Sequence, residues 1–234
     1  MAQKVRTRRP KPPRISSRAK RYATYQRWKR WLGHIREDIT TLAVHRRIYR
    51  EVTGMISANP RLQVPSSFYD WVRIAHVNDM TLGIRRLVDW DSRSISFIRL
   101  IEEIKDHPEV LTRRRYVALY RTGLKRLGHR DFDRFARPGR NEINPALIAR
   151  DRQALVKAQE RLRRFVNKHV AHRSRYPMRR LPTYADLDAC VDLLEGLLKK
   201  YVLLLEAQGL TRVLPVWQYD WKAPFRIAWV SDTP

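Results

Sequence analysis

Two histidines continue an apolar stripe along one stretch of helical sequence. The stripe consists of two series of residues spaced seven apart: Leu155, Leu162 and His169, and Ala158, Phe165 and His172. Residues seven apart share one face of a helix, and residues three apart are neighbours on it, so we expect His169 and His172 to lie side by side. Imidazole exchanges a proton near neutral pH, which suits both side chains to general acid–base catalysis.

Arginines flank this pair of histidines. Arg164 precedes it, Arg173 follows it directly, and Arg175 belongs to the basic stretch that comes next. A guanidinium group can hold a phosphate through two parallel hydrogen bonds. The pattern therefore predicts chemistry on a phosphodiester. The alternative that stays open is that both histidines are ordinary interface residues whose nitrogens have partners.

The charge of the whole chain points to a polyanionic partner. Lys and Arg number 49 against 23 Asp and Glu, which gives a formal net charge of +26. Such a charge destabilises a compact fold by self-repulsion unless something neutralises it, and phosphate backbones do so. Most of the positive groups are arginines, which also stack on bases, so we expect RNA as the partner. A bias toward arginine codons without any partner is the plain alternative.

The first 31 residues contain twelve of the basic groups and no acidic one. Arg8, Arg9 and Arg14 stand among three prolines, a composition typical of a disordered segment. We expect residues 1–32 to form a basic arm that binds nucleic acid. The remaining residues still carry 37 basic against 23 acidic groups, a net +14, so the arm alone does not account for the charge.

Aromatic and basic residues alternate in the second half of this arm. Tyr and Trp recur every three residues, which suits base stacking combined with phosphate contact. The nucleic-acid ligands predicted here are Arg21, Arg27, Trp28, Lys29 and Arg30. The alternative is a basic helix whose aromatic stripe packs on the core of the protein.

The apolar rhythm of the rest of the chain predicts an all-α fold. Helices are expected at 34–57, from Ser66 or Ser67 to 88, from Asp91 or Ser92 to 106, at 145–172, and from a capping box at Thr183 and Asp186 to Gly209. Residues 122–150, with their glycines and prolines, should form a long loop with short helical pieces. Together these segments predict a bundle of four or five helices over residues 33–212.

The last residues, 213–234, are rich in Trp, Tyr and Phe. Alternation of aromatic and polar residues from Trp217 to Trp221 suggests an extended segment laid along the bundle. Covering a groove of the bundle suits such a tail better than binding a partner, because single aromatic residues are mostly core material.

Several classes of function are excluded by what the sequence lacks. The single cysteine, Cys190, can build neither a disulfide framework nor a thiolate zinc site. Glycine-rich phosphate loops and paired-histidine metal motifs are absent, and Asp89, Glu103 and Lys105 have a nuclease-like spacing on helical sequence, where that chemistry needs strands. We therefore expect no metal and no cofactor. Apolar stretches fall short of the roughly 20 residues of a membrane span, and we expect a soluble, cytoplasmic protein without a membrane partner.

Two stretches of the chain resemble the HEPN superfamily, in its AbiU-type abortive-infection branch. One is Asn167-Lys168-His169-Val170-Ala171-His172-Arg173. The other is Trp71-Val72-Arg73 running into Gly83-Ile84-Arg85-Arg86-Leu87-Val88-Asp89, followed by Ser94-Ile95-Ser96-Phe97. With the final helix, the resemblance covers roughly residues 34–210.

The resemblance implies a helical bundle that pairs into a homodimer. Active members are metal-independent ribonucleases with an arginine, four to six intervening residues and a histidine, and two protomers form a composite site. Here His172 best matches the family histidine and Asn167 the polar position, while Val166 stands where the arginine is usual. A shifted match joins Arg163 or Arg164 to His169.

Two hypotheses follow from these observations. The first is an RNA-cleaving enzyme of a host-defence or toxin–antitoxin system, with His172 as base or acid, helped by His169, with Arg164 and Arg173 on the phosphate, and with an antitoxin protein as a further partner. The second is a non-catalytic bundle of the same type that binds RNA or a partner protein through its basic surface.

Overall fold

The computed structural model describes residues 17–165 and 182–228, and in these ranges the protein is all-α, as predicted, without a β-strand. Five helices are long: α1 (Ser17–Ala58), α2 (Ser67–Leu87), α3 (Phe97–Asp106), α6 (Pro145–Phe165) and α7 (Tyr184–Glu206). Shorter elements are α4 (Arg113–Val117), α5 (Lys125–Asp133) and 3-10 turns at Pro60–Leu62, Pro108–Val110, Thr122–Leu124 and Ala223–Arg226.

One continuous core joins α1, α3, α6 and α7. Helix α1 buries a stripe at spacings of three and four residues, consisting of Tyr25, Trp28, Leu32, Ile35, Ile39 and Leu42. This spacing places the side chains on one face of the helix, so their burial holds α1 against the rest of the bundle. Cys190 on α7 lies inside this core, and burial raises the pKa of its thiol to about 12. It is a packing residue, as expected.

Helix α1 begins earlier than the sequence suggested. It starts at Ser17 and continues without a break through residue 32, where the boundary between arm and bundle was expected. Tyr25, Trp28 and Leu32 are all at most 5% exposed. That boundary was therefore wrong: residues 17–32 are the first third of a 42-residue helix and part of the core.

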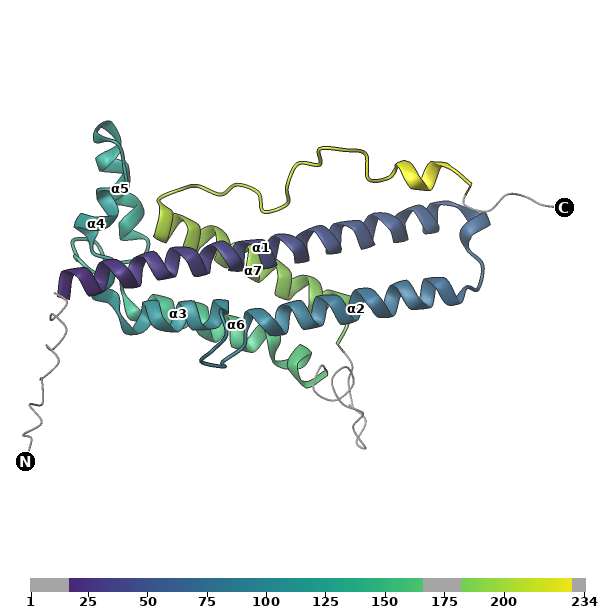
Figure 1. Cartoon of the computed structure of the whole chain (residues 1–234), viewed down its shortest axis with the longest axis horizontal. Coiled ribbons are helices and arrows are strands. Elements are labelled where there is room, and N and C mark those ends of the chain that lie inside the picture. Colours follow the sequence, from purple (N-terminus) through teal and green to yellow (C-terminus); the bar gives the residue numbers. More distant parts are fainter. Residues whose placement is uncertain (1–16, 166–181, 229–234) are drawn as a thin grey trace, which may run out of the picture.

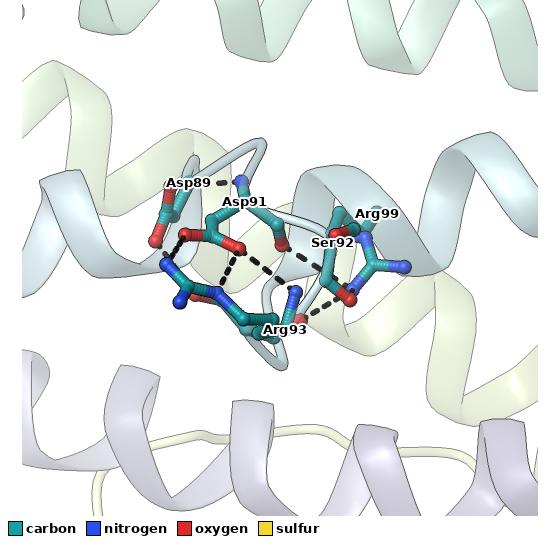
Figure 2. A network of polar contacts seen from close by, with 6 residues as sticks. Asp89, Asp91, Ser92, Arg93 and Arg99 are labelled. Atoms are coloured by element: carbon teal, nitrogen blue, oxygen red, sulfur yellow. Dashed lines mark hydrogen bonds and ion pairs between the residues drawn. The ribbon is translucent and has the colours of Figure 1, made fainter.

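The turn between α2 and α3 contains Asp89, one of the residues that carry the family resemblance. The carboxylate of Asp89 accepts hydrogen bonds from the Ser94 hydroxyl at 2.8 Å and from the Asp91 backbone N–H at 3.1 Å. Figure 2 shows the neighbouring contacts, in which Arg93 holds the Asp91 carboxylate and Arg99 donates to backbone carbonyls of the turn. These bonds fix the direction in which the chain leaves α2, so this part of the motif is structural.

Ser96, and not Asp91 or Ser92, caps the third helix. Its hydroxyl donates to the Asp89 carbonyl at 2.6 Å, and its side chain is fully buried. The predicted start was too early because the residues from 91 to 95 are used in the polar turn instead. The predicted end of this helix at residue 106 is confirmed, as is the start of α2 with Ser66 as its cap.

The region expected to be irregular, residues 122–150, contains the 3-10 turn Thr122–Leu124 and the short helix α5, and α4 lies just before it. Helices α4 and α5 stand together at the end of the bundle where α1 begins (Figure 1). Tyr116, Phe132 and Phe135 form their shared core, with ring centroids of Tyr116 and Phe132 5.4 Å apart. The prediction of a loop with short helical pieces is thus confirmed for this segment.

Both ends of the segment that joins α6 and α7 are described. Helix α6 is described to Phe165, so its expected continuation to His172 lies outside the described residues. The capping box of Thr183 and Asp186 opens α7 as predicted. The helix ends at Glu206, where Ala207 takes a left-handed conformation with φ 54°, so the role expected of Gly209 belongs to Ala207.

The C-terminal residues run back along the bundle beside α1 (Figure 1). Val213 is buried against the core, and Lys222 forms a 2.5 Å ion pair with Glu51 on α1. Trp217 and Trp221 pack on each other with ring centroids 5.8 Å apart, whereas Tyr219 is 70% exposed. The tail does lie along the bundle, but it is not extended throughout, because hydrogen-bonded turns from Tyr219 onward lead into the 3-10 turn Ala223–Arg226. None of the described helices is long and apolar enough to cross a bilayer.

Candidate functional site

The predicted catalytic segment lies mostly outside the described residues. Asn167, His169, His172, Arg173 and Arg175 fall between the described ends of α6 and α7. The predicted arm ligands Arg8, Arg9 and Arg14 also lie outside. The structure therefore describes only the neighbouring elements, which are the end of α6 and the start of α7 for the catalytic segment and the start of α1 for the arm.

Arg164 is described, on the last turn of α6. Its Nε donates to Oε1 of Glu160 at 3.0 Å, and Arg163 donates to both oxygens of the same carboxylate. The two guanidinium groups lower the pKa of Glu160, with Arg163 as the larger cause. The Arg164 side chain is 65% exposed, so this ion pair is a surface interaction of about 0–1 kcal/mol that a phosphate can displace.

The apolar stripe that leads toward the histidines is already covered within one chain. Leu155 is 0% exposed and Leu162 is 1% exposed, and both belong to the core shared with α3 and α7. Gln159 on the same helix is also buried. Leu155 and Leu162 are therefore not available to pack against a second copy of the chain.

A second group of titratable side chains lies where the chain enters α7. Nδ1 of His45 and Oδ2 of Asp79 are 2.6 Å apart, which joins α1 to α2 through a histidine–carboxylate pair. The rings of Tyr49 and His76 stack in parallel with centroids 3.8 Å apart. The hydroxyl of Tyr184, on the first turn of α7, lies 2.8 Å from that of Tyr49.

Burial shapes the electrostatics of this second group. It lowers the pKa of His76, against the opposing effects of Asp79 and Asp188. It also raises the pKa of Tyr49, helped by the hydrogen bond to Tyr184. The groove beside these rings, between α1 and α2, has a volume of about 260 Å³. The sequence did not predict this group, because its members come from three helices. The only local signal is that His76 and Asp79 are three residues apart and therefore neighbours on α2.

Trp28 was predicted to stack on bases, and this prediction was wrong. Its ring is 0% exposed, and its indole Nε1 donates to Oε2 of Glu103 at 2.8 Å. Arg27 donates to the same oxygen at 2.5 Å. Tyr25 and Trp28 pack on the core, which was the alternative interpretation of this aromatic stripe, whereas Tyr22 stays exposed.

The other predicted ligands in this helix stay on or near the surface. Arg30 is exposed, and Arg21, Lys29 and Arg27 are partly exposed. Tyr22 is 56% exposed, with the guanidinium of Arg115 over its ring at 5.7 Å. A further basic surface lies on α4 and α5. The sequence analysis predicted no ligand there, because the glycines and prolines of residues 122–150 indicated a loop.

Within the described ranges there is no cluster of three or more His, Cys, Asp or Glu side chains that could hold a metal ion. Two candidate groups are thus described: Arg163 and Arg164 at the end of α6, and the histidine–tyrosine group of α1, α2 and the first turn of α7. These groups can supply protons and positive charge.

Comparison with known proteins gives one match. Neither a curated protein nor a solved structure matches the chain. The sequence profile of the AbiU2 family of HEPN domains matches residues 25–222, which is most of the chain and runs from within α1 through α7 into the tail. The chain is a member of the HEPN superfamily, in its AbiU2 family.

Proposed function

We propose that this protein binds RNA and cleaves it as a metal-independent endoribonuclease. The observation that carries the proposal is the exposed pair Arg163 and Arg164 on the last turn of α6, immediately before the segment with His169 and His172. Membership in the HEPN superfamily supports the same reading, because the resemblance implies a ribonuclease site at this place.

The reaction proceeds by attack of a ribose 2′-hydroxyl on the adjacent phosphate. An O2′–P bond forms and the P–O5′ bond breaks, which leaves a 2′,3′-cyclic phosphate and a 5′-hydroxyl. His172 takes the proton from the 2′-hydroxyl or gives one to the leaving oxygen, and His169 assists it. Arg164 and Arg173 stabilise the charge that develops on the phosphate oxygens.

A non-catalytic bundle that binds RNA or a partner protein is the second candidate. Val166 favours it, because this residue stands where the family motif has an arginine. A site without that arginine loses a cation that would face the phosphate. In that case the basic surface of the protein supplies binding alone.

The biological setting is proposed on the same grounds. A ribonuclease of this family suits a host-defence or toxin–antitoxin system in the cytoplasm, with an antitoxin protein that restrains it. The family site is composite, so we propose that two copies of the chain pair and bring two motifs face to face.

The decisive experiment incubates labelled RNA with the purified protein in excess chelator. We expect cleavage by the wild type, a 2′,3′-cyclic phosphate on the product, and no cleavage of a substrate with a 2′-deoxy sugar at the cleaved position. His172→Ala should lower the rate about a hundredfold or more, which is the usual size of general acid–base help. His34→Ala, at an exposed histidine on α1, is the matched control and should cut normally.

Three other results contradict the proposal. Loss of activity in chelator contradicts the metal-independent mechanism, and equal cutting of DNA contradicts attack by a 2′-hydroxyl. RNA that is bound but never cut supports the non-catalytic bundle.

A further inference from the structure

The segment of residues 113–140, called here the α4–α5 segment, concentrates positive charge at one end of the bundle. It contains nine Arg, one Lys and two Asp. Both aspartates are already engaged, since Asp133 accepts from Arg113 at 2.5 Å and Asp131 accepts from the Tyr120 hydroxyl at 2.8 Å. Among the described residues, the pair of Arg113 with Asp133 is the segment's only ion pair.

Three of these arginines form a stripe on α5. Arg126, Arg130 and Arg134 follow one another at intervals of four residues, the last at the C-cap, where the backbone is still helical. All three are exposed, and residues four apart lie on the same face, about 6 Å apart along the axis. Like charges at this spacing destabilise a helix, and this helix has only nine residues. An anion bound along the stripe removes that cost.

The segment is held in a fixed shape without using these three side chains. The guanidinium of Arg113 is 12% exposed and donates to the carbonyls of Arg140 and His129, besides its bond to Asp133. It also lies over the ring of Phe132 at 4.8 Å. The backbone that carries the arginine stripe is therefore fixed by packing. The three positive charges are held on one helical face before any ligand binds.

The basic start of α1 lies beside α4. Arg115 on α4 donates to the carbonyls of Val110 and Arg21, and its guanidinium lies over the rings of Tyr25 and Tyr22. These contacts place α4 against the first turns of α1, as Figure 1 shows. Tyr22 is 56% exposed, so its ring is accessible beside the cationic surface.

We propose that the α4–α5 segment and the first turns of α1 bind the phosphate backbone of an RNA strand. This inference rests on the proposed function, because it assigns the binding surface for the RNA that the site would cut. Guanidinium groups pair with phosphate oxygens, and the exposed ring of Tyr22 offers a stacking surface for a base. An acidic membrane would satisfy the charges but has no base to stack there.

The test compares two variants that lose the same charge. Arg126→Gln, Arg130→Gln and Arg134→Gln remove the stripe, and glutamine keeps a good helix propensity. The matched control replaces three exposed arginines that are already ion-paired elsewhere, as Arg73→Gln, Arg93→Gln and Arg226→Gln. Both variants carry three fewer positive charges than the wild type, so a difference between them reports position and not net charge.

Binding is measured by fluorescence anisotropy with a labelled single-stranded RNA, at several salt concentrations, in a His172→Ala background. Each lost phosphate contact should make the slope of log affinity against log salt shallower by about 0.7, so the stripe variant should lose about 2 units. Its affinity near 0.1 M salt should fall roughly tenfold or more, while the control stays close to the parent. A third variant with lysine at the same three positions should keep most of the slope.

Equal binding by the stripe variant and the control overturns the inference. So does a stripe variant that binds RNA normally but no longer sediments with vesicles of anionic lipid, which would assign the surface to a membrane. Matching circular dichroism spectra and melting temperatures for both variants show that a loss is not due to unfolding. If the salt slope of RNA binding changes as expected but the wild type cuts no RNA, the RNA-binding surface is supported and only the proposed catalysis is contradicted.

Discussion

Trp28 and Glu103 are joined by a 2.8 Å hydrogen bond from the indole N–H to a carboxylate oxygen. The two residues lie on α1 and α3, and Arg27 donates to the same oxygen. The Glu103 carboxylate thus accepts a hydrogen bond from the buried Trp28 indole and also pairs with the Arg27 guanidinium. It ties the basic start of α1 to the centre of the bundle.

Glu103→Ala should therefore destabilise the fold by about 1–3 kcal/mol, because it leaves the buried indole N–H without an acceptor. Glu103→Gln should cost less, since its amide oxygen can still accept the bond. Urea unfolding followed by circular dichroism measures both. Adding Trp28→Phe to Glu103→Ala should recover part of the loss, and strictly additive effects would contradict this relationship.

Deletions from the N-terminus should show which of the first residues contribute to the stability of the core. Deleting residues 1–16 removes six positive groups and leaves α1 intact, so the melting temperature should stay near that of the full chain. Deleting residues 1–31 removes Tyr25 and Trp28 from the core and should abolish the cooperative transition. A shorter chain that melts normally would show that these two rings are dispensable. If the six groups touch phosphate, the first deletion should also make the salt slope of RNA binding shallower by up to about 4 units.

Stability should depend on pH through His76. Burial holds the pKa of this imidazole below its ordinary value of 6.5, so the unfolded chain takes up a proton at a higher pH than the folded chain does. Stability should fall as the pH drops through about 6.5 toward the lower pKa of the folded state. Above that window the residue contributes no pH dependence.

Urea midpoints between pH 7.5 and 5.5 test this expectation. His76→Gln should flatten the curve relative to the wild type, whereas Leu82→Gln, at an exposed position of the same helix, should leave its shape unchanged. An identical curve for His76→Gln would assign the pH dependence to other groups. The nearby charges of Asp79, Asp188 and His45 stay in place in both variants.

Restoring the missing arginine should raise ribonuclease activity. Val166→Arg supplies the cation at the position where the family motif has one, so the cleavage rate should increase if the active site is otherwise complete. Adding His172→Ala to this variant should remove the gain. A rate that Val166→Arg leaves unchanged indicates that other arginines already hold the phosphate, or that the chain does not cleave.

The parts of the fold that could be predicted are those whose signals are local. The capping box of Thr183 and Asp186 and the Ser66 cap of α2 involve residues within a few positions of each other. Burial depends instead on neighbours that are distant in sequence. The spacing of Trp28 from the other aromatic residues of α1 is the same whether its ring binds RNA or packs in the core. Its contact with Glu103, 75 positions away, shows that it packs in the core.

The candidate site shows the same limit. The pair of His45 and Asp79 joins two helices across 34 positions, so no spacing rule finds it. Gly128 lies within α5, one of the short helical pieces expected between residues 122 and 150. A Cβ atom at that position would come within 2.7 Å of the Tyr120 ring, so the glycine permits close packing. The sequence did not give the bounds of this helix, so it did not show that Arg126, Arg130 and Arg134 share one helical face.

The length of α1 decides how its second half is held. The helix spans 42 residues, about 63 Å, yet its last buried residue is Ala43, and the first buried residue of α2 is Met80. Beyond Ala43 the helix is held largely by ion pairs. Arg46 and Arg50 pair with Asp192 and Asp188 on α7, and Glu51 pairs with Lys222 in the tail. Salt screens exposed ion pairs, so the attachment of this end of α1 depends on ionic strength in a way that the buried core does not.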